Sequence, residues 1–168
     1  MEPTLRQGET FLARTGDFGP IERGGVFVVR KRGTHYVMRV VGLPGDQFEV
    51  TGSGIFLKDK AAYYSDENTD GAIGTCAKGP PLILREHLPG GASHLIMACN
   101  YSFGEDQPPI LIPAGHYFLM GDNRSNAADS RFNSPDLGLG LVPASDFVAR
   151  AERIFLSSDV RRIGKEID

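Results

Sequence analysis

Short runs of β-branched, aromatic and aliphatic residues recur along the chain, and glycine, proline or aspartate separates each run from the next. This pattern is typical of β-strands joined by turns, whereas helical periodicity is almost absent. We therefore expect an all-β fold. The predicted strands lie near residues 9–13, 25–30, 36–43, 47–51, 55–58, 82–85, 94–97, 116–120 and 149–156.

Two local patterns predict more detail. Residues 47–58 contain two β-rich arms that are joined by glycine, serine and glycine at positions 52–54. Glycine adopts positive φ angles at no steric cost, so this segment is predicted to form a hairpin. Residues 143–151 are the one segment with some helical character, and we expect one or two helical turns there, capped by Ser145, before the last strand.

The chain is short enough to form one domain over residues 1–168. Within it, residues 61–106 are a candidate for a smaller inserted β-rich region. Residues 63–79 lack periodicity and are rich in polar and small side chains, which predicts a loop or a weakly ordered insertion. Residues 122–144 form a long, polar, glycine-rich segment after an apolar strand, and such irregular segments usually carry function.

Composition excludes several classes of function. The net charge of -3 and the pI near 5.8 leave no broad basic surface, so we expect no nucleic-acid partner. The cluster Arg161, Arg162 and Lys165 is interpreted as a solvated tail. No apolar run approaches the roughly 20 residues that cross a bilayer, and the start of the chain has no signal-peptide pattern. Cys76 and Cys99 either pair in an oxidising compartment or remain buried thiols.

Three separated segments have to be considered together. They are MEPTL at residues 1–5, MRVVGLPGD at residues 38–46 and GDNRSNAADSR at residues 121–131. Their order and spacing resemble type I signal peptidases, where the strings read Ser-Met-x-Pro-Thr-Leu, Lys-Arg-Val-x-Gly-x-Pro-Gly-Asp and Gly-Asp-Asn-Arg-Asp-Asn-Ser-x-Asp-Ser-Arg. One such string is compatible with an ordinary turn, but three in order across most of the chain are not a chance match.

The resemblance implies coiled antiparallel β-sheets and a serine-lysine endopeptidase that needs no cofactor and no metal. In this chemistry a neutral lysine amine takes the proton of the serine hydroxyl and later returns it to the leaving amine. The lysine must be desolvated to be neutral at pH 7, so the apolar β-core is part of the mechanism. Small pockets beside the site select the Ala-x-Ala pattern of signal peptides.

The resemblance also implies roles for residues of this chain. Arg39 with Asp122, and Asp129 with Arg131, correspond to ion pairs that brace the site. Asp129 and Arg131 are two positions apart, so on a strand they would share a face. The substrate-groove positions are filled by Leu5, Tyr36 and Val37, although each also suits a plain core role.

The catalytic positions themselves depart from the family pattern. Met38 stands where the family has the general-base lysine, and a thioether cannot accept a proton. Ala127 replaces the serine that hydrogen-bonds the lysine amine, and Ser125 replaces an aspartate. The nucleophilic serine would directly precede Met1. We therefore expect no turnover from the chain as given.

Three origins are compatible with these departures. The chain is a natural degenerate relative, an excised core that lacks an upstream serine and membrane anchor, or a sequence that starts at an internal methionine. Only degeneration or deliberate substitution accounts for Met38. His35 is a weak substitute base, because alternation along a strand puts positions 35 and 38 on opposite faces.

The sequence thus predicts a signal peptidase-like protein of the outer face of the bacterial inner membrane or periplasm, soluble in the form given. Its expected partners are signal peptides of preproteins, of the Ala-x-Ala type, and the membrane surface through a missing N-terminal anchor. The alternative is a non-catalytic peptide-binding or assembly factor, in which an extended peptide adds as a strand to an open sheet edge.

Overall fold

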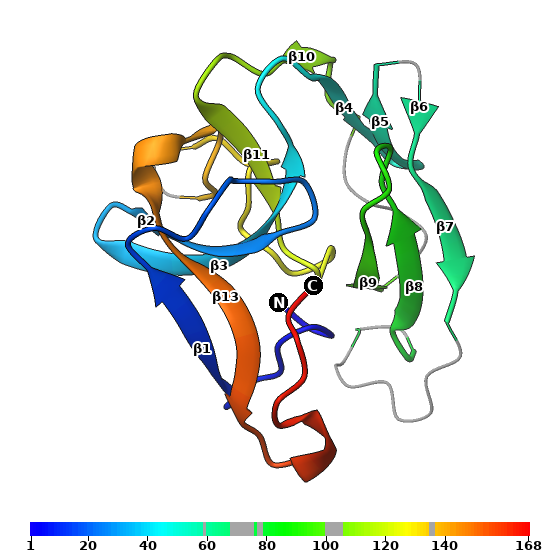
Figure 1. Cartoon of the computed structure of the whole chain (residues 1–168). Helices are drawn as coiled ribbons and strands as arrows, with labels where there is room; N and C mark the ends of the chain where they lie inside the picture. The colour runs from blue at the N-terminus through cyan, green and yellow to red at the C-terminus, as the bar shows by residue number, and fades with distance from the viewer. Residues whose placement is uncertain (59, 68–75, 77–78, 100–105, 135–136) are drawn as a thin grey trace.

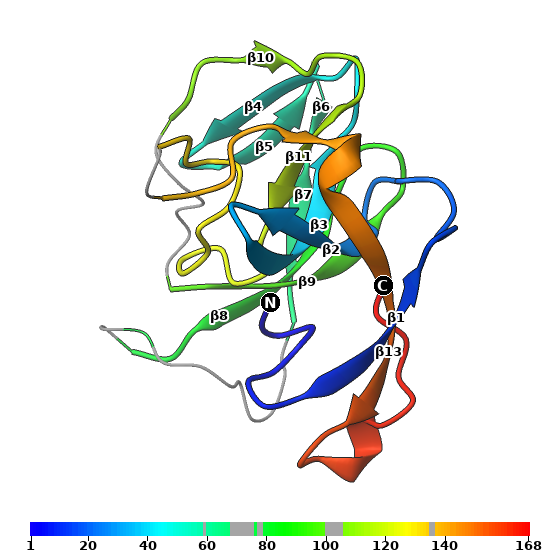
Figure 2. The same cartoon turned by 90° about the vertical axis from the view of Figure 1, so that its left-hand side faces the viewer.

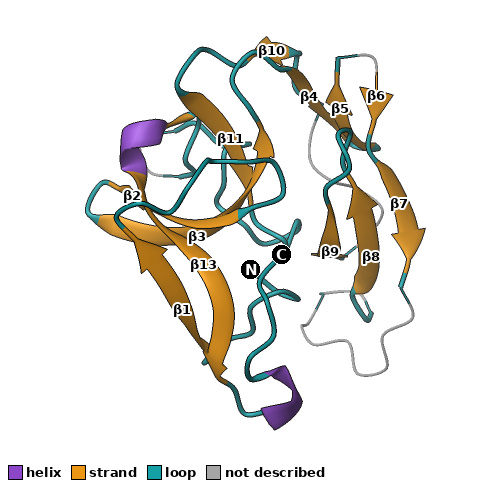
Figure 3. Cartoon of the chain, in the orientation of Figure 1, coloured by secondary structure: helices purple, strands orange, loops and turns teal. Residues whose placement is uncertain are grey.

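The computed structural model describes residues 1–58, 60–67, 76, 79–99, 106–134 and 137–168. Among these residues antiparallel β-strands predominate, and two short 3-10 turns are the only helical elements, so the predicted all-β class is confirmed (Figures 1 and 3). The elements are β1 (Thr10–Thr15), β2 (Val26–Lys31), β3 (Thr34–Gly42), β4 (Gln47–Thr51), β5 (Gly54–Leu57), β6 (Lys60–Ala61), β7 (Tyr63–Asp66), β8 (Leu82–His87), β9 (Ser93–Ala98), β10 (Ile110–Leu111), β11 (His116–Met120), β12 (Val142–Pro143), η1 (Ala144–Asp146), β13 (Phe147–Leu156) and η2 (Val160–Arg162).

The strands form three sheets. The largest has the order β1-β13-β2-β3-β11-β12, the second β10-β4-β5-β6, and the third β7-β8-β9. Figures 1 and 2 show the ribbon of β1 and β13 extending away from the other strands, with η2 at its far end. The third sheet lies on the opposite side of the molecule in Figure 1 and falls within the segment that the sequence marks as a candidate insertion.

Strand β3 belongs to the centre of the largest sheet, and its side chains alternate between two cores. Tyr36 and Met38 pack with a cluster that includes Phe27 of β2, whereas Val37 packs against a different cluster that contains Leu5. This alternation follows from the two-residue repeat of a pleated strand. It confirms that even- and odd-numbered positions of β3 face opposite sides of the sheet.

One edge of β3 is only partly covered. Along one side, β2 pairs with β3 from Thr34 to Arg39. Along the other side, β11 pairs only with the end of β3, where Arg39, Val40 and Gly42 are its partners. No pairing to residues 34–38 on that side is present among the residues that the structure describes. These five residues therefore offer a free strand edge.

The predicted hairpin is present, with a shorter turn. Thr51 pairs with Gly54, so the connection between β4 and β5 consists of Gly52 and Ser53 alone. A positive φ occurs at Gly54, at 144°, and not at Gly52. Gly54 is thus the first residue of β5 and no part of the loop.

Two other predictions are wrong in part. Residues 63–79 are not simply a loop, because Tyr63–Asp66 form β7 and pair with β8; residues 68–75 and 77–78 lie outside the described residues. The helical prediction for residues 143–151 is correct only for the 3-10 turn η1. The predicted cap is wrong, because Ser145 lies inside the turn and Pro143 takes the N-cap position without a side-chain hydrogen bond. Strand β13 begins directly afterwards, since tertiary pairing with β2 overrides the weak local preference.

The basic segment after β13 folds back, so the interpretation as a solvated tail is wrong for Arg162, whereas Arg161 and Lys165 are exposed. Arg162 donates from Nε to the carboxylate of Glu9 at 2.6 Å and from Nη2 to the carbonyl oxygen of Thr4 at 2.8 Å. Ile167 is buried in the same cluster as Leu5. The C-terminal segment therefore fixes the conformation of the first residues of the chain.

Candidate functional site

The three sequence segments meet around the carboxylate of Asp122. Arg39 of β3 donates to it from Nε and from Nη2, each at 2.8 Å, and both side chains are fully buried. The hydroxyl of Thr4 also hydrogen-bonds the Asp122 carboxylate. The remaining terminal nitrogen of Arg39 donates to the carbonyl oxygen of Gly24 at 2.5 Å. This network connects the N-terminal segment, β3 and the loop after β11.

The network sets the charge state of Asp122. Burial alone would raise the pKa of this carboxyl, but the positive charge and the hydrogen bonds of Arg39 outweigh burial, so the pKa lies below its ordinary value. Asp122 is therefore a carboxylate at neutral pH. A paired, fully hydrogen-bonded ion pair of this kind fixes geometry, and removing one partner leaves an uncompensated buried charge.

Asp129 and Arg131 also form a pair, by a different route from the one predicted. The Nε and Nη2 atoms of Arg131 donate to the two carboxylate oxygens of Asp129 at 2.9 and 2.8 Å. These residues lie in a turn and not on a strand, so a shared strand face is the wrong explanation. The backbone N–H groups of Arg131, at 3.1 Å, and of Gly121, at 3.0 Å, also donate to the Asp129 carboxylate, and the second bond connects the turn to the end of β11.

Met38 and Ala127 both lie next to Gly121. A Cβ atom on Gly121 would lie 2.5 Å from the Cβ of Ala127 and 3.8 Å from the Sδ of Met38. Only a glycine fits here, because the first of these distances is far below van der Waals contact. Met38 is 7% exposed and packs among apolar side chains such as Val40 and Leu119. The position that holds an amine in the resembled family is thus apolar in this chain.

A cavity of about 510 Å³ opens beside the free edge of β3. We call it the β3 cavity. The three predicted groove residues, Leu5, Tyr36 and Val37, all line it. Its other lining residues are Met1, Glu2, Arg6, Gln7, Glu9, Phe11, His35, Asn123 and Asn126. The same three residues also pack against core clusters, so the core role and the cavity role coincide.

His35 lines the β3 cavity but does not reach the side of Met38. Its side chain is exposed, two residues along the strand from Val37 and therefore on the same face. Met38 faces the opposite core. His35 is therefore poorly placed to replace the lysine of the family pattern.

A buried charged cluster lies on the far side of the Asp122 loop, and sequence reasoning missed most of it. Arg124 donates from Nη1 and Nη2 to the two oxygens of Glu86, each at 2.5 Å, and Nε2 of His94 lies 3.0 Å from the same carboxylate. All three side chains are buried. Glu86 and His94 directly face each other on β8 and β9. Charged residues at inward positions of apolar strands were the available signal.

Opposing contributions determine the pKa values in this cluster. Burial alone would raise the pKa of Glu86, but the charge of Arg124 and the hydrogen bonds from His94 and Arg124 lower it well below its usual range. Burial, followed by the charge of Arg39, lowers the pKa of His94, against the hydrogen bond to Glu86. His94 is therefore neutral at pH 7, and its Nδ1 is buried without a hydrogen-bond partner among the described residues.

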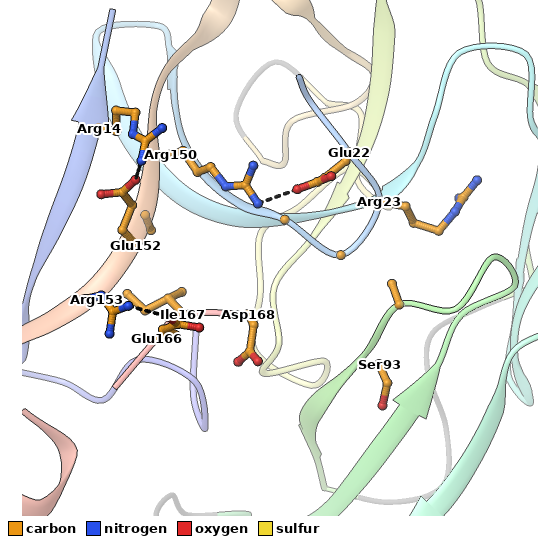
Figure 4. Close-up of a pocket in the computed structure, with 14 residues that line it drawn as sticks. Arg14, Glu22, Arg23, Ser93, Arg150, Glu152, Arg153, Glu166, Ile167 and Asp168 are labelled. Atoms are coloured by element: carbon orange, nitrogen blue, oxygen red, sulfur yellow. Dashed lines mark hydrogen bonds and ion pairs between the residues drawn. The ribbon is translucent and has the colours of Figure 1, made fainter. Parts of the chain in front are cut away.

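A second cavity, of about 580 Å³, is lined by a different set of residues and is shown in Figure 4. Strand β13, the last three residues and the start of β9 contribute to its wall. Its charges are largely paired within the protein, for example Arg150 with Glu22 and Arg14 with Glu152, each at 2.5 Å. It contains none of the predicted site residues, so the β3 cavity is the candidate site.

Cys76 and Cys99 form a disulfide, which settles the alternative left open by the sequence. Cys99 follows β9 directly, and its backbone N–H donates to the hydroxyl of Ser125 at 2.9 Å. The disulfide therefore lies next to the loop that borders the β3 cavity. In the described part of the chain no helix has the length and apolarity to cross a membrane.

Comparisons with known proteins identify the same family as the three sequence segments do. The family model described as "Signal peptidase, peptidase S26" matches residues 1–156. A signal peptidase I of Pseudomonas aeruginosa is 34% identical, with 94% of this chain covering 62% of that protein. A signal peptidase I P of Bacillus subtilis subsp. natto is 32% identical over 98% of this chain and 77% of its own length. A signal peptidase I of Rickettsia felis is 31% identical over 83% of this chain and 53% of its own length. The chain thus spans only part of these relatives.

Proposed function

The chain belongs to the signal peptidase family, and from this membership we propose that it binds the signal-peptide region of exported preproteins as an extended strand, without cleaving it. The observation that supports this proposal most directly is the free edge of β3 beside the β3 cavity. An extended peptide that adds to such an edge gains backbone hydrogen bonds, while alternate side chains enter flanking pockets. Tyr36 and Val37 lie on that edge and line the cavity.

The absence of turnover is proposed from the base position. Catalysis by this family's chemistry requires a group that accepts a proton near neutral pH. Met38 has no such group, and Ala127 has no hydroxyl to orient one. Both departures from the family pattern lie next to Gly121, which supports a site that no longer holds a buried amine. His35, on the opposite face of β3, does not offer an alternative.

We further propose that the chain acts at the outer face of the bacterial inner membrane, next to preproteins that are crossing it. The disulfide between Cys76 and Cys99 supports this location, because disulfides persist in oxidising compartments such as the periplasm. The proposed ligands are signal peptides with the Ala-x-Ala pattern. The proposed second partner is the membrane surface, which the protein would contact through an N-terminal anchor.

The competing function is the reaction named in its relatives, the removal of signal peptides. The two intact ion pairs, Arg39 with Asp122 and Asp129 with Arg131, favour it, because they keep the framework of the site. Both functions require peptide binding at the β3 cavity. They differ in whether a bound preprotein is cut.

One experiment tests binding and cleavage together. A fluorescent peptide with an Ala-x-Ala segment is titrated with the purified chain, and the same mixtures are analysed by mass spectrometry for cleaved product. We expect saturable binding, no product, and loss of binding when alternate peptide nitrogens are methylated, because methylation removes the edge hydrogen bonds. Product formation would show that the function is catalysis and not binding alone.

Variants connect the binding to the β3 cavity. Tyr36→Ala removes a large side chain from its wall and should weaken peptide affinity by about tenfold, the effect of a typical interface anchor. Leu12→Ala is the matched control, because Leu12 is an exposed apolar residue of β1 that does not line the cavity. Equal effects of the two variants, or binding that tolerates methylation, would rule out the proposed groove.

A further inference from the structure

Glu86 lies outside the three sequence segments, yet it contacts the loop that borders the β3 cavity. Its carboxylate is fully buried and receives two hydrogen bonds from Arg124, each at 2.5 Å. The Nε of Arg124 donates to the carbonyl oxygen of Gly121 at 3.2 Å. The guanidinium therefore connects β8 of the third sheet to the loop after β11 with a defined geometry, because a bidentate pair fixes both distance and orientation.

The backbone of the same loop runs along β9. Met97 of β9 donates from its N–H to the carbonyl oxygen of Asp122 and accepts from the N–H of Arg124, both at 2.8 Å. Asn123, between them, forms a parallel bridge with Met97. The loop is thus an additional short strand beside the third sheet. Its backbone is held by Met97, and the side chain of Arg124 is held by Glu86.

Two buried ion pairs hold this loop from opposite directions. Asp122 is bound to Arg39 of the largest sheet, and Arg124 is bound to Glu86 of the third sheet. Asn123 lies between these two anchored positions and lines the β3 cavity together with Asn126. The position of these two carboxamides therefore depends on both pairs.

From these contacts we propose that Glu86 is a positioning residue for the peptide groove: through Arg124 it fixes where Asn123 and Asn126 present their side-chain amides to a bound peptide. Each carboxamide offers two donors and one acceptor oxygen, which suits the backbone amides and polar side chains of an extended peptide. This inference rests on the proposed peptide-binding function. It assigns the third sheet a part in recognition, with the Ala-x-Ala peptide as the ligand.

The test compares four proteins: wild type, Glu86→Gln, Glu86→Asp and Glu67→Gln. Glu86→Gln leaves the Arg124 guanidinium buried without a counter-charge. Glu86→Asp keeps the charge but shortens the side chain by one methylene, so the two-point contact at 2.5 Å is lost. Glu67→Gln is the matched control, because Glu67 directly follows β7, pairs with Arg85 of β8 at 2.6 Å, is about one-third exposed, and has no ion pair to the loop among the described residues.

Three quantities are measured for each protein: the peptide dissociation constant, the denaturation midpoint, and the NMR resonances of the Asn123 and Asn126 side-chain amides in the free protein. We expect Glu86→Asp to keep most of the stability while it weakens peptide binding by about tenfold, within the range of such couplings. The two amide resonances should shift in both Glu86 variants and stay in place in Glu67→Gln. Should Glu86→Gln fail to fold, Glu86→Asp still carries the test.

The possible results are distinguishable. Wild-type-like amide resonances in Glu86→Asp, or peptide affinity that follows only the denaturation midpoint across the four proteins, would overturn the positioning role. Failure of the wild type to bind peptide would overturn the proposed function instead, and the amide resonances of the free protein would then decide the positioning role by themselves.

Discussion

Asp122 and Arg39 are 83 positions apart in the chain and form a two-point ion pair that is shielded from solvent, with Nε···Oδ1 and Nη2···Oδ2 distances of 2.8 Å. The pair joins β3 to the loop after β11, and Thr4 adds the N-terminal segment to it. Removal of either charge should therefore affect stability more than any exposed ion pair of the protein does.

Asp122→Asn should lower the free energy of unfolding by about 3–5 kcal/mol, because the Arg39 guanidinium would remain buried without a counter-charge. Chemical denaturation measures this change. Glu152→Gln is the control, since the Arg14–Glu152 pair is largely exposed and is expected to contribute less than about 1 kcal/mol. Similar losses in the two variants would contradict the assigned importance of the buried pair.

Met38→Lys tests the apolar pocket directly. An ammonium placed among Val40 and Leu119 loses its hydration, so burial should lower the pKa of the new lysine well below the unfolded value of about 10.4. The unfolded chain then binds more protons than the folded one at neutral pH, and the stability of the variant should rise with pH. We expect a loss of about 3 kcal/mol or more at pH 7 that shrinks towards pH 10.

The matched comparison for Met38→Lys is the double variant with Ala127→Ser. Positions 127 and 38 both border Gly121, so a serine hydroxyl at position 127 offers the new amine a hydrogen-bond partner and part of the lost stability should return. Denaturation curves from pH 7 to 10 measure both effects. A constant difference from the wild type over this range would mean that the lysine side chain escapes to solvent.

Cys76→Ser combined with Cys99→Ser should lower the free energy of unfolding by about 3 kcal/mol, as expected for a disulfide whose cysteines are 23 positions apart. Urea denaturation with and without reductant measures it. The wild type should lose a comparable amount on reduction, whereas the double variant should not respond to reductant. A wild type that is insensitive to reductant would be inconsistent with a stabilising cross-link.

His94 should make stability pH-dependent near neutrality. It faces Glu86 on β8, Arg39 on β3, and Asp122 and Arg124 on the loop. Burial and the Arg39 charge lower its pKa in the folded protein, so below the unfolded value of about 6.5 the unfolded chain binds a proton that the folded chain does not. Stability should therefore fall as pH decreases below about 6.5, by up to about 1.4 kcal/mol per pH unit.

Denaturation between pH 7.5 and 5 measures this dependence for the wild type, His94→Gln and the control His116→Gln. His94→Gln should flatten the curve, and His116→Gln, which changes a histidine of β11 outside the buried cluster, should not. An unchanged slope in His94→Gln would exclude His94 as the responsible group.

Glu9 should contribute stability that is lost only in acid. Burial by itself would raise its pKa, but hydrogen bonds from Arg162, the Arg6 backbone and Ser157 lower it to about 2. The contribution is complete above the unfolded value of 4.5 and decreases as pH falls from there to about 2. Glu9→Gln should thus lower stability at pH 7 and show a shallower acid transition between pH 4.5 and 2.

Much of the fold could be predicted from the sequence. All nine predicted strands are present, with ends that differ by one or two residues, because alternating apolar side chains and glycine or proline breaks report local backbone preference. Strands β6, β7, β10 and β12 were missed. Three of them have only two residues, and β7 is polar and mostly exposed, so neither hydrophobic alternation nor length indicated them.

The candidate site, too, could be predicted from the sequence only in part. The identities of Met38 and Ala127, and the candidate pairing of Arg39 with Asp122, follow from short strings whose residue types are specific. Their roles in a working site remain predictions, as does the treatment of residues 61–106 as an insertion. The buried charges of the third sheet were not predicted, because Glu86 and His94 lie on strands that contain no family motif.

By itself the sequence determined the all-β class, the family resemblance and the chemistry missing at position 38, since each depends on residue type and short-range order. Only the tertiary structure decided which alternative Cys76 and Cys99 adopt, that Arg162 binds Glu9, and that Glu86 faces Arg124. Those contacts join positions that are 23, 153 and 38 apart. They form because sheet packing brings distant strands together and excludes water, and no local pattern encodes which buried charge will meet which.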